Sequence, residues 1–196
     1  MPKKPKHKHS TPLEWGQVYH IYIRGVNREN IFIEERNYAS FLQSYARHIE
    51  PIADTFAYCM LKNHFHVLVR IKNSTTKPPS QSFSSFFNAY ARSINLAYGR
   101  TGSLFERPFG RIPVTSEAGF MNLVVYIHQN PQIHGLVEDF RSWPYSSFEM
   151  MLGEKTTLLK RDEVLRLFGG THSLTAEHKG QSDLKKIAYL IGNDED

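Results

Sequence analysis

The stretch Asn63-His64-Phe65-His66-Val67-Leu68-Val69 decides how the rest of the chain is interpreted. Its β-branched and aromatic residues predict a buried strand. Because successive side chains of a strand point to opposite faces, His64 and His66 share one face and Phe65 points to the other. Two neutral imidazoles on one face can bind one divalent cation. The alternative is a strand with two half-exposed histidines that pair across a sheet.

Strands and helices alternate around this stretch. The strands predicted from alternating apolar residues are 18–23, 55–61, 64–71 and 110–114. The helices predicted from apolar residues three and four apart are 34–49, 83–98 and 116–129. Ser116 is expected to cap the last of these helices and Pro131 to end it. The link Lys62-Asn63 predicts a tight antiparallel hairpin.

The order of these elements indicates the fold class. It reads strand, helix, strand, strand, helix, strand, helix. We therefore predict an α+β, ferredoxin-like (split βαβ) fold, in which the helices cover one face of an antiparallel sheet.

Three parts of the chain are predicted. Residues 1–12, rich in lysine, histidine and proline, are expected to form a disordered basic tail. Residues 13–136 hold the predicted α+β domain, and residues 137–196 form a C-terminal wrap and helical extension. Within the extension, we expect an irregular segment at 139–153, a helix at 161–168, a flexible polar segment at 171–182 and a last helix at 183–191.

Composition restricts the class of protein. The chain has 196 residues, 40% of them hydrophobic, which is enough for a buried core without disulfides. Cys59 is its single cysteine, so an internal disulfide is excluded and a reducing compartment fits. No apolar run is long enough to span a membrane. We expect a cytoplasmic, nucleoid-associated protein with no membrane partner.

Positive charge is concentrated in two places. The net charge is +5, and four of these charges come from lysines in the tail. The segment 70–111 contains seven basic residues and a single acidic residue, Glu106, and phenylalanines and tyrosines lie among them in the sequence. Basic grooves with aromatic platforms bind single-stranded nucleic acid. The alternative is that most of these aromatic residues belong to the core. The candidate DNA-binding residues are Arg70, Lys72, Arg92, Arg100, Arg107 and Arg111.

The predicted helix 116–129 adds candidates for chemistry. Tyr126 and Asn130 are four residues apart, so they lie on one helix face. Asn130 could add a carbonyl oxygen to the two imidazoles as a third metal ligand. This mixed nitrogen and oxygen set suits Mg²⁺ or Mn²⁺. The alternative for Tyr126 is an ordinary half-buried tyrosine. His20 either faces the same site or packs on a neighbouring strand, and His128 has no assigned role.

Together, these residues resemble a known family. The strand His64-Phe65-His66 is similar to the histidine-hydrophobe-histidine signature of the HUH endonucleases, and Tyr126-Ile127-His128-Gln129-Asn130-Pro131 is similar to the nucleophile helix of their single-tyrosine transposases. The branch that the chain most resembles is the REP-associated tyrosine transposases, over about residues 17–170. The insertion-sequence relatives usually have glutamine where this chain has Asn130.

The resemblance implies a reaction and a substrate. Residues 13–136 would be an HUH catalytic domain, with Tyr126 as the nucleophile and His64, His66 and Asn130 as ligands of Mg²⁺ or Mn²⁺. The substrate would be single-stranded DNA next to an imperfect hairpin of the REP palindrome type. Cleavage would leave a 5′-phosphotyrosine and a 3′-hydroxyl, and the protein would act as a monomer or a homodimer.

Two other functions fit parts of the pattern. A ferredoxin-like sheet with aromatic residues also builds RNA-recognition domains, so the chain could be a non-catalytic module that binds single-stranded nucleic acid. A metal-dependent phosphoesterase that uses water would need a charged ligand or a general base. After Asn130, the first acidic residue is Glu138.

Overall fold

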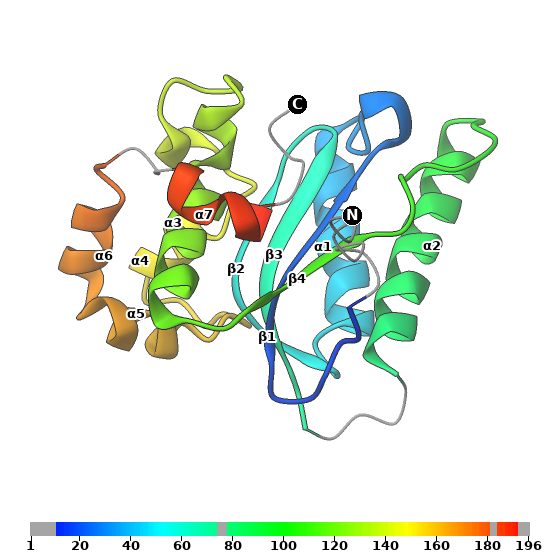
Figure 1. Ribbon diagram of the computed structural model, residues 1–196. Coiled ribbons are helices and arrows are strands. Elements are labelled where there is room, and N and C mark those ends of the chain that lie inside the picture. The colour runs from blue at the N-terminus through cyan, green and yellow to red at the C-terminus, as the bar shows by residue number, and fades with distance from the viewer. Residues whose placement is uncertain (1–10, 74–77, 181–183, 192–196) are drawn as a thin grey trace, which may run out of the picture.

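A four-stranded antiparallel sheet forms the centre of the computed structural model (Figure 1). Its strands are β1 (Val18–Arg24), β2 (Ala53–Met60), β3 (His64–Ile71) and β4 (Gly110–Val114). They lie in the order β2-β3-β1-β4. The structure describes residues 11–73, 78–180 and 184–191. The predicted ferredoxin-like α+β fold and the hairpin at Lys62-Asn63 are confirmed.

The alternation along β3 divides its side chains between two environments. Phe65 packs against Phe41, with ring centroids 4.9 Å apart. His66 faces the opposite way and meets the ring of Tyr126. The register of β1 against β3 places Tyr22 opposite His66.

Helices cover both faces of the sheet. The helices α1 (Glu35–His48) and α2 (Pro79–Ala97) pack together on one face, and the helices α3 (Glu117–Ile133) and α7 (Leu184–Ile191) lie on the other (Figure 1). The prediction that helices cover only one face was therefore wrong. The strands are apolar on both faces, as is typical of a sheet buried on both sides. The histidines of β3 consequently face α3 rather than solvent.

The helix α3 continues beyond its predicted end. Ser116 caps it as predicted, because the Gly119 N–H donates to the Ser116 Oγ at 3.1 Å. Pro131 lies inside the helix, so the prediction that it ends the helix was wrong. A proline removes only one N–H, and the next turn closes when the His134 N–H donates to the Asn130 carbonyl at 3.0 Å. Asn130 is therefore held on a helical turn.

The C-terminal extension contains more helix than predicted. The helix α5 (Arg161–Phe168) is confirmed, and α7 confirms the expected last helix. The segment expected to be irregular contains a 3-10 turn η2 (Phe140–Ser142) and a helix α4 (Phe148–Leu152). The segment expected to be flexible forms α6 (Thr171–Glu177).

The prediction of a flexible segment failed at α6 because that segment has a buried side. Leu174 and His178 are both buried there.

A second 3-10 turn, η1 (Val26–Arg28), follows β1. Residues 1–10 of the predicted tail lie outside the described residues. Within the described parts of the chain, no helix combines the length and apolar character needed to cross a bilayer.

Candidate active site

The two histidines of β3 are the centre of the candidate site. The His64 and His66 ring centroids are 5.0 Å apart and the rings are perpendicular. His64 is 4% exposed and His66 is fully buried, so both are shielded from bulk water. The prediction that they share one face of the sheet is confirmed.

The helix α3 brings the other two predicted residues to these histidines. The ring centroid of Tyr126 lies 5.9 Å from that of His66. One turn later, the Asn130 Oδ1 lies 3.2 Å from the His64 Nε2. Tyr126 and Asn130 lie on one face of α3, and His64 and His66 lie on one face of β3. Because α3 packs on this face of the sheet, the four residues form one cluster although they are far apart in the sequence.

Two further histidines contact this cluster. The His20 Nε2 lies 2.9 Å from the His66 Nδ1, so His20 both packs on the neighbouring strand and faces the candidate site, and the two interpretations of this residue hold together. The His134 ring centroid lies 4.8 Å from that of His64. The sequence analysis missed His134, although it continues the spacing of Tyr126 and Asn130 by another four residues.

The atoms around His64 fit a bound cation. The Asn63 Nδ2 donates to the Arg28 carbonyl at 3.3 Å, which turns the Asn63 Oδ1 toward the His64 Nδ1 at 2.7 Å. The proton of a neutral His64 therefore lies on Nδ1, and its Nε2 lone pair faces the Asn130 oxygen. A cation bound by both atoms would satisfy these two acceptors.

Asn130 supports the same interpretation. Its Nδ2 group is buried and has no hydrogen-bond partner among the described residues, while its oxygen faces His64. Imidazole nitrogens and an amide oxygen are ligands that Mn²⁺ accepts. Nowhere in ranges 11–73, 78–180 and 184–191 do three or more His, Cys, Asp or Glu side chains form a group that could hold a metal ion. The candidate set is thus two histidines and an amide.

Cys59 lies near the site but does not suit metal binding. It pairs in register with His66 across β2 and β3, and it is fully buried. Burial raises the pKa of its thiol well above the ordinary value, because a thiolate would lose its hydration. The protonated thiol is a poor ligand and a poor nucleophile.

The six basic residues predicted to bind DNA have different surroundings. Arg70 donates to Asp54 at 2.7 Å and to Glu163 at 2.6 and 3.1 Å, so it joins β2, β3 and α5. Lys72 donates to the Glu50 carbonyl. Arg111 lies over the Phe109 ring, 4.5 Å from its centroid.

The other three basic residues lie on α2 and in the loop after it. Arg100 pairs with Glu29 at 2.7 Å. Arg107 donates to Asn88 at 2.8 Å. Arg92 is exposed, and it lines a cavity of about 240 Å³ together with Arg107. The structure therefore places these basic residues at several locations rather than along one groove.

Most of the aromatic residues in this span are core residues, as the alternative interpretation stated. The members on α2 and in the segment before β4 are buried and therefore cannot act as stacking platforms. The buried members are Phe83, Phe86, Phe87, Tyr90, Phe105 and Phe109.

His128 belongs to a second histidine pair away from the candidate site. Its Nδ1 lies 2.9 Å from the His178 Nε2, and its Nε2 lies 2.8 Å from the Ser147 Oγ. The His178 Nδ1 donates to the Leu174 carbonyl at 2.7 Å. Burial lowers the pKa of His178 to about 4 and lowers that of His128 well below its ordinary value. Both rings are neutral, and they join α3 to the C-terminal extension.

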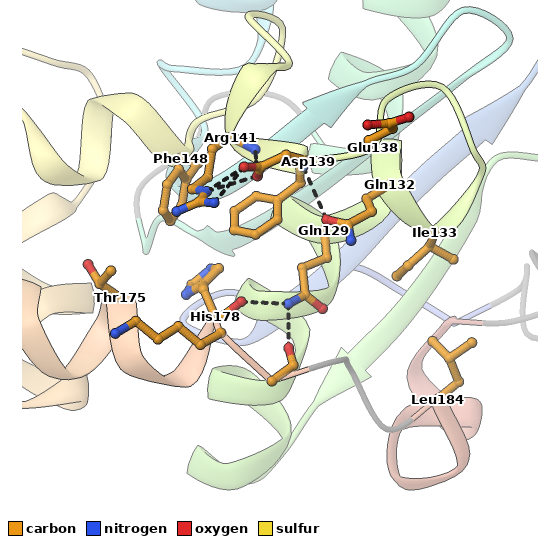
Figure 2. Close-up of a pocket in the computed structure, with 13 residues that line it drawn as sticks. Gln129, Gln132, Ile133, Glu138, Asp139, Arg141, Phe148, Thr175, His178 and Leu184 are labelled. Atoms are coloured by element: carbon orange, nitrogen blue, oxygen red, sulfur yellow. Dashed lines mark hydrogen bonds and ion pairs between the residues drawn. The ribbon is translucent and has the colours of Figure 1, made fainter.

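A large cavity lies beside this pair (Figure 2). It has a volume of about 800 Å³, and residues of η2, α3 and α6 line it. Gln129 donates to the His178 carbonyl at 2.9 Å and to the Gly180 carbonyl at 2.6 Å. None of His64, His66, Tyr126 and Asn130 lines this cavity. It is therefore separate from the candidate active site.

Comparisons with known proteins point to one group. No protein-family model matches the chain. The chain is 28% identical over 104 residues to a Haemophilus influenzae protein provisionally named REP-associated tyrosine transposase, a match that covers 48% of this chain. The match spans 58% of the length of that curated relative.

A solved structure of a REP-associated tyrosine transposase bound to a REP hairpin has a similar fold. The TM-score is 0.58 at 16% sequence identity, over 79% of this chain and 87% of that one. The chain is thus similar in sequence to a REP-associated tyrosine transposase over about half of its length, and it shares the fold of another such transposase.

Proposed function

We propose that this chain is a metal-dependent endonuclease and strand transferase that acts on single-stranded DNA at palindromic hairpins. The observation that carries the proposal is the cluster in which Tyr126 contacts His66, while Asn130 lies 3.2 Å from His64. A phenol, two imidazoles and an amide oxygen supply a nucleophile and a neutral set of ligands in one place.

Tyr126 is the proposed nucleophile. Its phenolic oxygen attacks the phosphorus of the scissile phosphodiester and loses its proton. The bond to the 3′ oxygen breaks, and that oxygen takes up a proton and leaves as a 3′-hydroxyl. A 5′-phosphotyrosine remains on the protein. Because one phosphoester bond replaces another, a 3′-hydroxyl can reverse the step and join strands without ATP.

His64, His66 and Asn130 are the proposed ligands of Mg²⁺ or Mn²⁺. When bound, the cation would draw charge from the nonbridging oxygens of the scissile phosphate. The side chains themselves add no charge, so the positive charge available to a phosphate is not reduced. The ligands come from β3 and α3, two packed elements, which favours a stable arrangement.

The site is closed in the arrangement described here. Tyr126 is 2% exposed and Asn130 is fully buried. A DNA phosphate can therefore reach the phenol only after neighbouring segments move.

The hairpin is proposed to bind through phosphate contacts. The six candidate residues remain Arg70, Lys72, Arg92, Arg100, Arg107 and Arg111. Arg92 and Arg107 share a cavity, and Arg92 is exposed. Neither forms an ion pair with another described residue, so both are placed to contact a phosphate.

Replacing Tyr126 with phenylalanine tests the nucleophile. Tyr126→Phe is expected to abolish the covalent adduct with a labelled single-stranded hairpin, because only the hydroxyl is removed. Hairpin affinity should stay within about twofold, since the ring remains in place. Denaturing gels measure the adduct, and filter binding measures affinity. Tyr189→Phe, at an exposed position in α7, is the control and should still form the adduct.

The results also separate the alternatives. Cleavage by Tyr126→Phe without an adduct would favour attack by water. Hairpin binding by the wild-type chain, with neither cleavage nor an adduct in Mg²⁺ or Mn²⁺, would favour a non-catalytic module that binds single-stranded nucleic acid.

Replacing the histidines tests the metal ligands. In the wild-type chain, Mn²⁺ at about 100 times its dissociation constant should stabilise the fold by about 2.7 kcal/mol. His64→Ala and His66→Ala should each lose most of this stabilisation and lose cleavage. Thermal unfolding with and without Mn²⁺ measures it. His172→Ala, at an exposed position in α6, should respond to Mn²⁺ as the wild type does.

A further inference from the structure

We infer that His20 is a positioning residue that holds His66 in the tautomer needed for metal binding, and that α7 sets this tautomer through the Leu190 carbonyl. The inference rests on the proposed metal site. It adds a role for β1 and for the C-terminal extension, neither of which supplies a proposed ligand.

The Leu190 carbonyl fixes which atoms donate and which accept in the two hydrogen bonds of His20. The His20 Nδ1 lies 2.7 Å from the Leu190 carbonyl oxygen. A carbonyl oxygen can only accept, so the His20 Nδ1 must carry a hydrogen. In a neutral His20, the other ring nitrogen, Nε2, is then an acceptor. This ring is fully buried in the sheet.

The hydrogen bond with His20 in turn fixes the tautomer of His66. The His20 Nε2 lies 2.9 Å from the His66 Nδ1. Because Nε2 accepts, the His66 Nδ1 must donate, and the His66 lone pair lies on Nε2. The two rings are nearly parallel, at 19°, with centroids 5.1 Å apart. The ring that approaches α3 therefore presents a nitrogen able to bind a metal.

His64 reaches the same tautomer by a different route. Its Nδ1 donates to the Asn63 Oδ1 at 2.7 Å, which leaves the Nε2 lone pair toward Asn130. Both histidines of β3 are thus protonated at Nδ1 and present Nε2, although their partners come from different elements. Residues that donate to or accept from a ligand histidine in this way commonly affect metal affinity 10- to 100-fold.

Two substitutions of His20 separate its two hydrogen bonds. In His20→Gln, the amide oxygen lies near the position of Nε2 and can accept from the His66 Nδ1, but the bond to Leu190 is lost. In His20→Asn, the amide nitrogen lies near the position of Nδ1 and can donate to Leu190, but the contact with His66 is lost. The pair isolates the effect on His66 from general damage to the strand.

The first measurement needs neither metal nor a variant. Histidine ¹⁵N chemical shifts of the metal-free wild-type chain should show His66 protonated at Nδ1. Observation of His66 protonated at Nε2 would overturn the inference. The tautomer should persist in His20→Gln and become mixed in His20→Asn.

The second measurement is Mn²⁺ affinity, by electron paramagnetic resonance of the unbound ion. We expect His20→Asn to bind Mn²⁺ about 10- to 100-fold more weakly than the wild type, and His20→Gln to stay within about threefold. Equal losses in both variants, or no loss in His20→Asn, would overturn the inference. A wild-type chain with the expected tautomer but no DNA adduct would refute the proposed nuclease and leave the role of His20 intact.

Discussion

At the scale of single residues, the proposed metal site depends on the hydrogen bonds that orient its histidine rings and its amide group. His64 and His66 have the same chemistry, yet Asn63 orients one and His20 orients the other. The proposed metal binding by Asn130 requires its oxygen to face His64, as it does in the structure. His20, His64, His66 and Asn130 are buried, so a proton or amide in the wrong orientation there would leave a polar group without a hydrogen bond and lower stability.

Gly110 controls the position of a ring beside the site. A Cβ at Gly110 would lie 2.1 Å from the Tyr22 ring, and that ring is 6.2 Å from His66 between centroids. Gly110→Ala should therefore displace Tyr22 and lower the free energy of unfolding by about 1–3 kcal/mol. Urea denaturation measures the change.

A matched glycine provides the control for this substitution. At Gly153, the nearest atom to a new Cβ would be a carbonyl oxygen 3.4 Å away, so Gly153→Ala should change stability by less than about 0.5 kcal/mol. In a Tyr22→Ala background, Gly110→Ala should cost much less, because the clashing ring is gone. An equal cost in both backgrounds would show that the ring contact is not the cause.

At the scale of elements, α3 is the piece that joins the site to the C-terminal extension. One side of it carries Tyr126 and Asn130 toward β3. Another side carries His128 and Gln129 toward α6, where both contact His178. The residues of the motif that have no proposed chemical role thus hold the helix in place.

The pair of His128 and His178 predicts an acid-sensitive contact between α3 and α6. The pKa of His178 is about 4 in the fold and about 6.5 in the unfolded chain. The unfolded chain therefore binds the proton first, so this contribution is complete above about pH 6.5 and is lost as the pH falls toward 4. It amounts to about 3 kcal/mol.

Unfolding as a function of pH checks this contact. His178→Gln keeps an acceptor for His128 but cannot titrate, so its unfolding free energy should fall less steeply between pH 6.5 and 4 than that of the wild type. His172→Gln, at an exposed position in α6, should retain the wild-type slope. A wild-type slope in His178→Gln would mean that another group causes the acid sensitivity.

At the scale of the whole molecule, the sheet separates two kinds of surroundings. Helices α1 and α2 cover one face and α3 and α7 cover the other (Figure 1). Aromatic rings such as Phe41, Phe65 and Phe86 pack together on the first face, and the contact between His66 and Tyr126 lies on the second. The basic side chains lie outside both, and several are engaged in ion pairs. Hairpin binding should therefore depend on a subset of them.

Salt dependence identifies this subset. Arg92→Gln and Arg107→Gln should each weaken hairpin binding and reduce the slope of log affinity against log salt by about 1, because each would remove one phosphate contact. Arg70→Gln is the comparison, since Arg70 is held by Asp54 and Glu163. It should lower stability more than it changes the salt slope. An equal change of slope in all three would make Arg70 a DNA contact as well.

The sequence by itself determined the strands, most of the helices and the shared face of His64 and His66, because these follow from periodicities of a few residues. It also brought out Tyr126 and Asn130 as partners through their helical spacing. Only the tertiary structure decided that α3 covers the face opposite α1, that α6 is ordered and that the aromatic residues are core. It alone decided the partners of His20 and His128, because His20 meets Leu190 across 170 residues, a distance at which no local pattern records which atoms will face each other.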